Sequence, residues 1–122
     1  EDRVIALPDD DGDGRADDMV VVGSDYEVAH SVAFAPDGSL LIAGTGTLYR
    51  ITLDEAMAET TREPILRYAP SGQHSTRTVV VAPDGSLLVS HGSSCNVCCS
   101  NAMGCREGGI VSCTRCQVDW ST

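Results

Sequence analysis

Residues 71–98 read SGQHSTRTVVVAPDGSLLVSHGSSCNVC, and this stretch decides the fold. A Pro-Asp-Gly turn at 83–85 separates two apolar runs, 79–81 and 87–89. This pattern is typical of two antiparallel strands joined by a tight turn. Side chains able to do chemistry, with His74 the first of them, lie at the ends of this predicted hairpin. Because sites on β scaffolds are usually built in the loops, we expect a functional site there.

The central part of this hairpin occurs twice in the chain. The segment APDGSLL spans residues 35–41 and recurs at 82–88, 47 positions later, with apolar residues on both sides of each copy. A period of about 40–50 residues with roughly four short strands is typical of a β-propeller blade. Because the two copies are identical and lie in the same strand context, they are unlike two unrelated hairpins that share a common turn. The sequence therefore predicts an all-β fold, a β-propeller fragment of two to three blades.

The rest of the chain fits this interpretation. Residues 54–62 include helix-forming side chains, but the run is short and weakly amphipathic, so we expect a connecting turn. The tail, residues 99–122, shows no strand periodicity. We therefore divide the chain into propeller blades at 1–98 and a Cys-rich tail at 99–122, non-native or disordered. Short apolar or alternating runs predict further strands at 3–7, 19–22, 31–34, 40–43, 47–53 and 64–68.

Composition narrows the function classes. The 122 residues suffice for one core, which must rest on aliphatic side chains because only 4% are aromatic. A net charge of −10 argues against nucleic acid as a partner, since little here would neutralise phosphates. No run approaches the roughly 18 apolar residues that a membrane span needs. Glu1 stands where a Met would begin a chain, so we expect a processed, trimmed or partial chain. A propeller needs roughly four to eight blades to close, so the chain is expected to be either a fragment or a subunit that self-associates to complete the ring.

An acidic segment, PDDDGDGRADD at 8–18, joins the first two predicted strands. Its alternating carboxylates resemble the start of an EF-hand Ca²⁺ loop, but the twelfth position holds Val20 instead of the bidentate Glu. No complete EF-hand is therefore present. Two interpretations stay open, a Ca²⁺ site and a solvated acidic turn. The candidate Ca²⁺ ligands are Asp9, Asp11, Asp13 and Asp17.

Three motifs are informative when they are taken together: the acidic turn, the HSTRT segment at 74–78 before its PDG hairpin, and GSSCNVC at 92–98. Together they resemble the PQQ-dependent sugar dehydrogenases of the glucose/sorbosone dehydrogenase family, the L-sorbosone dehydrogenase-like members most of all. The resemblance covers residues 4–98. It implies a six-bladed propeller in which PQQ lies over the channel with Ca²⁺ on its ortho-quinone edge. The implied function is oxidation of a sugar or a sugar-derived aldehyde or alcohol, with an electron acceptor that the sequence does not define.

The resemblance also implies roles for individual residues. His74 matches the general base, and a histidine suits removal of a proton from a hydroxyl while hydride leaves carbon. Arg77 is implied near the cofactor or substrate, held there by its charge. Ser94 and Asn96 are implied at the same mouth, as cofactor-binding residues. His30 precedes the first PDG hairpin, and it either faces the channel as a cofactor-binding residue or caps a strand.

The family comparison also implies what this chain lacks. The residues that hold the PQQ carboxylates and most Ca²⁺ ligands would lie in later blades, so we expect the isolated chain to be inactive. Cys95 and Cys98 match a pair that would form a disulfide in an exported protein. Export to the periplasm or the medium is expected from the family and from the cysteines.

The six cysteines allow other interpretations. The pairs Cys95-x2-Cys98 and Cys113-x2-Cys116 have a spacing close to that of a four-thiolate zinc ribbon. For the tail we therefore keep three explanations: out-of-frame or chimeric sequence, a genuine disulfide-bonded tail, and a zinc site. The alternatives to an enzyme are a non-catalytic propeller-like scaffold that self-assembles and a small zinc-binding domain.

Overall fold

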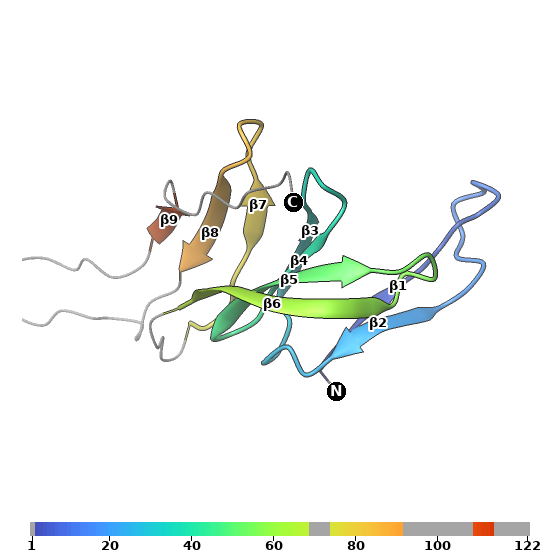
Figure 1. Cartoon of the computed structure of the whole chain (residues 1–122), viewed down its shortest axis with the longest axis horizontal. Coiled ribbons are helices and arrows are strands. Elements are labelled where there is room, and N and C mark those ends of the chain that lie inside the picture. Colours follow the sequence, from blue (N-terminus) through green and yellow to red (C-terminus); the bar gives the residue numbers. More distant parts are fainter. Residues whose placement is uncertain (1, 69–73, 92–108, 114–122) are drawn as a thin grey trace, which may run out of the picture.

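The structure is a computed structural model that describes residues 2–68, 74–91 and 109–113, the last range as backbone alone. Its described residues form nine strands in three antiparallel sheets, with no helix among them (Figure 1). The part of the chain described thus contains no helix long and apolar enough to cross a membrane. The strands are β1 (Arg3–Ala6), β2 (Val20–Ser24), β3 (Ser31–Phe34), β4 (Leu40–Ala43), β5 (Thr47–Leu53), β6 (Glu59–Arg67), β7 (Val79–Val81), β8 (Leu87–His91) and β9 (Gly109–Cys113).

The sheets follow one another along the chain, and each is a meander. The first sheet contains β1 and β2, the central sheet contains β3 to β6 in sequence order, and the third sheet contains β7 to β9. A central sheet of four sequential antiparallel strands is the architecture of a propeller blade. The predicted all-β propeller-fragment fold is therefore confirmed.

Both copies of APDGSLL form the same turn. In the first copy the Ala35 N–H donates to Ser39 O at 2.9 Å, and Gly38 has φ +84°. In the second copy the Ala82 N–H donates to Ser86 O at 2.8 Å, and Gly85 has φ +83°. Glycine is favoured at both positions because positive φ is strained for other residues. The repeat in the sequence is thus a repeat in the structure.

Two sequence expectations are corrected by the strands. β6 begins at Glu59, whereas the sequence placed its start at 64, because the turn before it is tight. Asp54 Oδ1 accepts the Ala56 and Ala58 N–H groups, each at 2.9 Å, so the chain reverses within a few residues. The tail was expected to contain no strand, yet β9 pairs antiparallel with β8.

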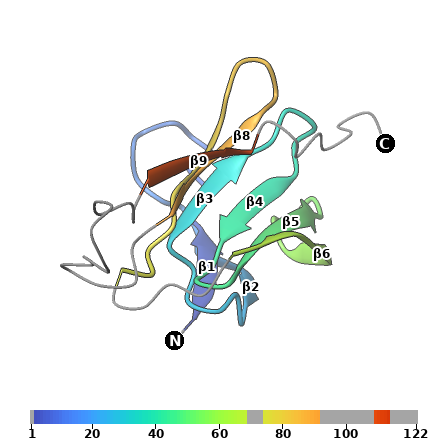
Figure 2. The same cartoon turned by 90° about the vertical axis from the view of Figure 1, so that its left-hand side faces the viewer.

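The central sheet lies between the first and third sheets (Figures 1 and 2), and its strand β4 is buried on both faces. Leu41, Ala43 and Leu48 pack on one face against the third sheet. Leu40 and Ile42 pack on the other face against the first sheet. All four residues of β4 are consequently buried, which explains its uninterrupted apolar sequence LLIA.

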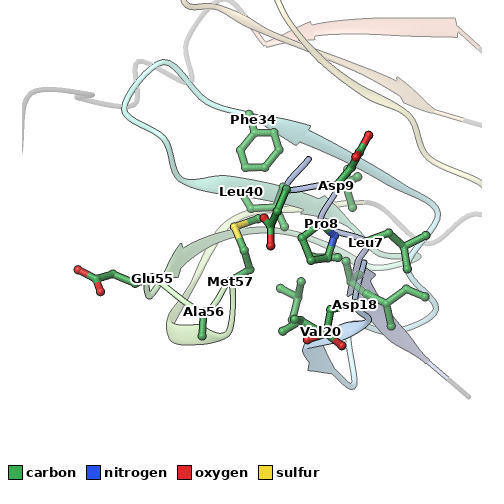
Figure 3. A pocket seen from close by; sticks show the side chains of 16 residues that line it. Leu7, Pro8, Asp9, Asp18, Val20, Phe34, Leu40, Glu55, Ala56 and Met57 are labelled. Atoms are coloured by element: carbon green, nitrogen blue, oxygen red, sulfur yellow. The ribbon is translucent and has the colours of Figure 1, made fainter. Parts of the chain in front are cut away.

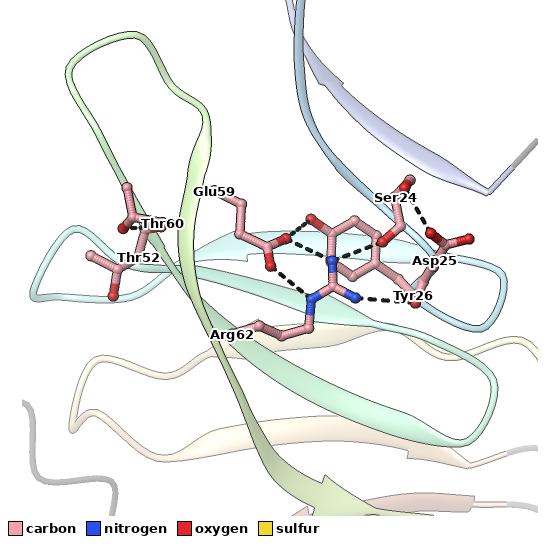
Figure 4. Close-up of polar contacts among 7 residues, drawn as sticks. All are labelled: Ser24, Asp25, Tyr26, Thr52, Glu59, Thr60 and Arg62. Carbon is pink, nitrogen blue, oxygen red and sulfur yellow. Dashed lines mark hydrogen bonds and ion pairs between the residues drawn. The ribbon is translucent and has the colours of Figure 1, made fainter.

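A polar cluster fastens the first sheet to the central sheet (Figure 4). Tyr26 is fully buried, and its hydroxyl donates to Glu59 Oε2 at 2.5 Å. The Arg62 guanidinium lies 4.2 Å from the centre of the Tyr26 ring and donates to both Glu59 oxygens at 2.8 Å. It also donates to Ser24 O at 2.7 Å and to Asp25 O at 3.2 Å. One guanidinium thus joins β6 to the end of β2.

Candidate functional site

The residues before β3 and before β7 lie at the same end of the molecule. The Val79 N–H donates to Ser31 Oγ at 3.2 Å, which joins the starts of these two strands. Thr78 and Ser90 exchange two hydrogen bonds, at 2.8 and 2.9 Å, so the end of β8 reaches this end as well. We call it the His30 end, because His30 immediately precedes β3. The two PDG turns lie at the opposite end, the turn end.

His30 is half-buried at this end and is held in place from two sides. Its N–H donates to Ala43 O at 2.9 Å. Its Nε2 lies 3.1 Å from Thr45 Oγ1, close enough for a hydrogen bond whose direction depends on the tautomer. The other ring nitrogen, Nδ1, takes no part in this contact. These two contacts give the His30 ring a defined position. The interpretations of His30 as a strand cap and as a cofactor-binding residue of the channel both stay predictions.

The loop that delivers His30 is strained and anchored. Asp25, Glu27 and Val28 all have φ near +60°, which is uncommon for non-glycine residues and most costly for a β-branched one. The Asp2 carboxylate accepts the Val28 and Ala29 N–H groups, both at 2.8 Å. Burial alone would raise the pKa of Asp2, but these backbone donors outweigh it and lower the pKa.

A close backbone approach also fixes this loop. A Cβ on Gly44 would lie 1.9 Å from the carbonyl oxygen of Tyr26, so only glycine fits where the loop passes β4. The neighbouring Thr45 N–H donates to Glu27 O at 2.8 Å. The chain from Gly44 to Thr45 is therefore a rigid support for the loop that carries His30.

His74 and Arg77 precede β7 at the His30 end, in different environments. His74 is exposed. Arg77 is 1% exposed, and its guanidinium carbon lies 4.9 Å from the centre of the Tyr68 ring. Tyr68 is itself tied to this end, because its N–H donates to Gly46 O at 2.9 Å. Burial raises the pKa of Tyr68 to about 12, although the nearby Arg77 charge acts in the opposite direction.

One histidine at this end was missed from the sequence. His91 ends β8 and is half-buried, and Ser90 before it is bonded to Thr78. The antiparallel hairpin could have revealed it, since the residue after the second apolar run must lie beside the residue before the first. The predicted residues Ser94, Asn96, Cys95 and Cys98 lie outside the described residues. Arg77 and His74 as cofactor or catalytic residues therefore stay predictions, as do these four.

The acidic turn lies elsewhere. Ligand oxygens of Asp9, Asp11 and Asp17 lie within 4.8 Å of one another, whereas Asp13 does not belong to this group. The Asp13 N–H instead donates to Asp9 Oδ1 and Asp11 Oδ1, both at 3.1 Å. The turn follows β1 at the turn end, so the structure does not bring these carboxylates to His30 or His74 (Figure 1).

The antiparallel sheets and repeated turns define a β-propeller protein, and solved structures share this architecture. No protein-family model matches the chain, and no curated protein matches it significantly. It is similar to the calcium structure of a Trichoderma reesei carbohydrate-active enzyme of family AA12, with 25% identity and a TM-score of 0.64. That match covers 77% of this chain and 25% of the other. The iodide structure of the same T. reesei family gives the same values.

A second solved protein has the same fold. The holo form of the pyranose dehydrogenase PQQ domain from Coprinopsis cinerea matches with a TM-score of 0.64 and 23% identity, over 71% of this chain and 22% of that one. The chain thus spans about a quarter of the length of the solved structures it resembles.

Proposed function

We propose that this chain is part of a PQQ-dependent quinoprotein dehydrogenase that oxidises a sugar or a sugar-derived aldehyde or alcohol. The observation that carries the proposal is the fold shared with the AA12 enzyme at 25% identity and a TM-score of 0.64. The HSTRT segment at the His30 end supports it, because it offers an exposed imidazole at the end of the molecule where β3 and β7 begin.

The residues at the His30 end fit a polar, anionic quinone. Arg77 brings a positive charge into the base of the loop that carries His74, and burial strengthens the field of such a charge. His30 and Thr45 add a hydrogen-bonding pair 3.1 Å apart beside the neighbouring strand. We propose that His30 contacts the cofactor with Nδ1, that Arg77 stabilises its negative charge, and that Ser94 and Asn96 complete this side.

PQQ, when bound, supplies an acceptor for two electrons from the substrate carbon. The task left to the protein is to remove the hydroxyl proton, and we propose that His74 does so. An exposed histidine can exchange that proton with solvent after each turnover. Arg77 would position the loop through its contact with Tyr68 in addition to its charge.

We further propose that Asp9, Asp11 and Asp17 bind a structural Ca²⁺ at the turn end. Three carboxylate oxygens within 4.8 Å of one another suit a cation whose ligand oxygens lie about 2.3–2.6 Å away. This ion would stabilise the turn and would not touch the substrate. We expect the protein to act in the periplasm or outside the cell, as the family resemblance implies.

The test is dye-coupled sugar oxidation by a protein that carries the whole propeller around this chain, reconstituted with PQQ and Ca²⁺. We expect His74→Ala to lower kcat by about 10²–10⁴-fold. Glu55→Gln is the matched control, since Glu55 is exposed in the turn between β5 and β6 at the opposite end. Full activity in His74→Ala would refute the assignment of the base, and a lack of PQQ-dependent activity with any aldose or sorbosone would refute the proposed reaction.

A further inference from the structure

Four Asp-Gly pairs in this chain adopt one local conformation. In each pair the aspartate side chain folds back over the next peptide, and its Oδ1 accepts the N–H of the residue two positions later at 2.8–3.1 Å. The glycine of each pair has φ between +73° and +84°. Since this geometry is shared, a difference in reactivity among the four pairs must come from the groups around them. The pairs are Asp11-Gly12, Asp13-Gly14, Asp37-Gly38 and Asp84-Gly85.

Both PDG turns hold the backbone nitrogen of their glycine. The Gly38 N–H donates to Ala35 O at 3.0 Å, and the Gly85 N–H donates to Ala82 O at 2.9 Å. A nitrogen held in this way must leave its acceptor before it can attack a carbonyl carbon, and that step costs the free energy of the hydrogen bond. The hydrogen bonds of the PDG turns therefore slow any reaction at these two glycines.

The two pairs in the acidic turn differ from each other. The Gly14 N–H donates to Asp9 Oδ2 at 3.0 Å, so this nitrogen is held as in the PDG turns. The Gly12 N–H donates to no acceptor in the part of the chain that the structure describes. A Cβ built on Gly12 would meet no atom within 4 Å, so the space beside its nitrogen is open. Among the four pairs, Gly12 thus has the nitrogen best placed to react.

The carboxyl group of Asp11 is also held less firmly than that of Asp37. Asp37 accepts the Ser39 hydroxyl at 2.6 Å and forms an ion pair with Arg50. Burial alone would raise the pKa of Asp37, but these contacts outweigh it and lower the pKa. Asp11 accepts the Asp13 N–H at 3.1 Å and no side-chain donor within the described residues. Its carboxyl carbon is therefore easier to turn toward the next nitrogen.

The tip of the acidic turn is open to solvent. Asp9, Asp10 and Asp18, at its base, line a cavity beside β1 (Figure 3). Residues 11–17 do not line this cavity, and all of them are exposed. Water can therefore reach any intermediate that forms at Asp11.

We infer that Asp11-Gly12 is a site of spontaneous isomerisation, at which the main chain passes from the α-carboxyl to the β-carboxyl group of Asp11. The Gly12 nitrogen attacks Cγ of the protonated Asp11 carboxyl, and the carboxyl hydroxyl leaves as water together with the amide proton. Water then opens the cyclic imide. Opening at the former main-chain carbonyl gives isoaspartate, and opening at the other carbonyl returns aspartate. The inference rests on the local structure and is independent of the proposed dehydrogenase activity.

This reaction would alter the acidic turn. Isoaspartate adds one carbon to the main chain and places the carboxylate directly on Cα. The Asp11 oxygen would then leave the group that it forms with Asp9 and Asp17, whose ligand oxygens lie within 4.8 Å of one another. The group of three carboxylates would therefore be lost as the protein ages.

Incubation of the folded chain at neutral pH tests the inference, with EDTA present to keep cations away from the carboxylates. Peptide mapping with electron-transfer fragmentation identifies isoaspartate at each pair separately. We expect Asp11-Gly12 to isomerise at least about fivefold faster than each of the other three pairs, which is the net contribution of one hydrogen bond expressed as a rate. Equal rates at the four pairs, or a faster reaction at another pair, would overturn the inference.

The same measurement in urea separates the effect of the structure from that of the sequence. In the unfolded chain the four pairs should react at similar rates, because glycine supplies the attacking nitrogen in each of them. If Asp11-Gly12 were still faster by the same factor in urea, the difference would not come from the fold, and the inference would fail.

A pair of variants tests the role of the held nitrogen. Asp9→Ala removes the acceptor of the Gly14 N–H, so isomerisation at Asp13-Gly14 should become about fivefold faster. Asp10→Ala is the matched control, because it removes the same charge from the same turn and the Asp10 carboxylate accepts no glycine N–H among the described residues. An equal rise in both variants, or no rise in Asp9→Ala, would overturn the inference.

Discussion

Removal of one hydroxyl from the cluster at Tyr26 should measure how firmly the first sheet is held. Tyr26→Phe deletes the donor to Glu59 Oε2, so that the fully buried Tyr26 side chain loses its 2.5 Å hydrogen bond to a partly buried carboxylate. Hydrogen bonds to charged groups contribute about 1.5–3 kcal/mol. Glu59 keeps both hydrogen bonds from Arg62, so its carboxylate is not left unpaired. We therefore expect the lower end, a loss of about 1.5 kcal/mol in the free energy of unfolding.

Urea denaturation at pH 7, followed by far-UV circular dichroism, gives this free energy directly. Tyr49→Phe is the matched control, because the Tyr49 hydroxyl donates to Glu27 Oε1 across 3.3 Å in an exposed pair. Its loss should be within about 0.5 kcal/mol. Equal effects of the two substitutions would refute the reasoning, since the partly buried hydrogen bond from Tyr26 to Glu59 would then contribute no more than a surface contact.

Three further predictions concern the same fold. Arg62 holds the pKa of the Glu59 carboxyl below its usual 4.5, so the stabilisation by Glu59 should be full above about pH 4.5 and fall as the pH drops through the lower folded-state pKa. The difference in urea midpoint between wild type and Glu59→Gln should therefore shrink only in that acidic range. A difference that is constant with pH would contradict this prediction. Gly44→Ala should destabilise the fold by more than about 3 kcal/mol, because its Cβ would lie 1.9 Å from a backbone oxygen. Gly12→Ala should cost about 1–2 kcal/mol, because Gly12 has φ +73° but open space around it. Thermal melts should show a larger loss of melting temperature for Gly44→Ala than for Gly12→Ala. Millimolar Ca²⁺ should raise the melting temperature of the wild type and not that of Asp11→Asn, and no shift in the wild type would favour the plain acidic turn.

The regular part of the fold could be predicted from the sequence because local signals agree there. The PDG turns, with glycine at the positive-φ position, fix the hairpins, and β3, β4 and β5 have the bounds expected from their apolar runs. The predicted β6 was too short, because its first residues, ETTRE, are polar and mostly exposed and show no apolar pattern. β9 was missed because its pairing with β8 is a long-range contact and not a local signal.

The site was only partly predictable, for a similar reason. His74 and His30 could be named from their place before a PDG hairpin. The burial of Arg77 against Tyr68 could not, because it depends on how the residue after β6 lies relative to the segment before β7. The separation of the acidic turn from the His30 end likewise follows from the register of β1 with β2, which composition does not reveal.

The double-sided burial of β4 has a consequence for the order in which the structure comes apart. A strand covered on both faces and paired on both edges can expose its amides only when the sheets on either side leave. Its amide protons should then exchange at the rate set by global unfolding, while those of β1 and β7 exchange through smaller openings. β4 would be the last element to lose its structure and the reference against which the cooperativity of the three sheets can be measured.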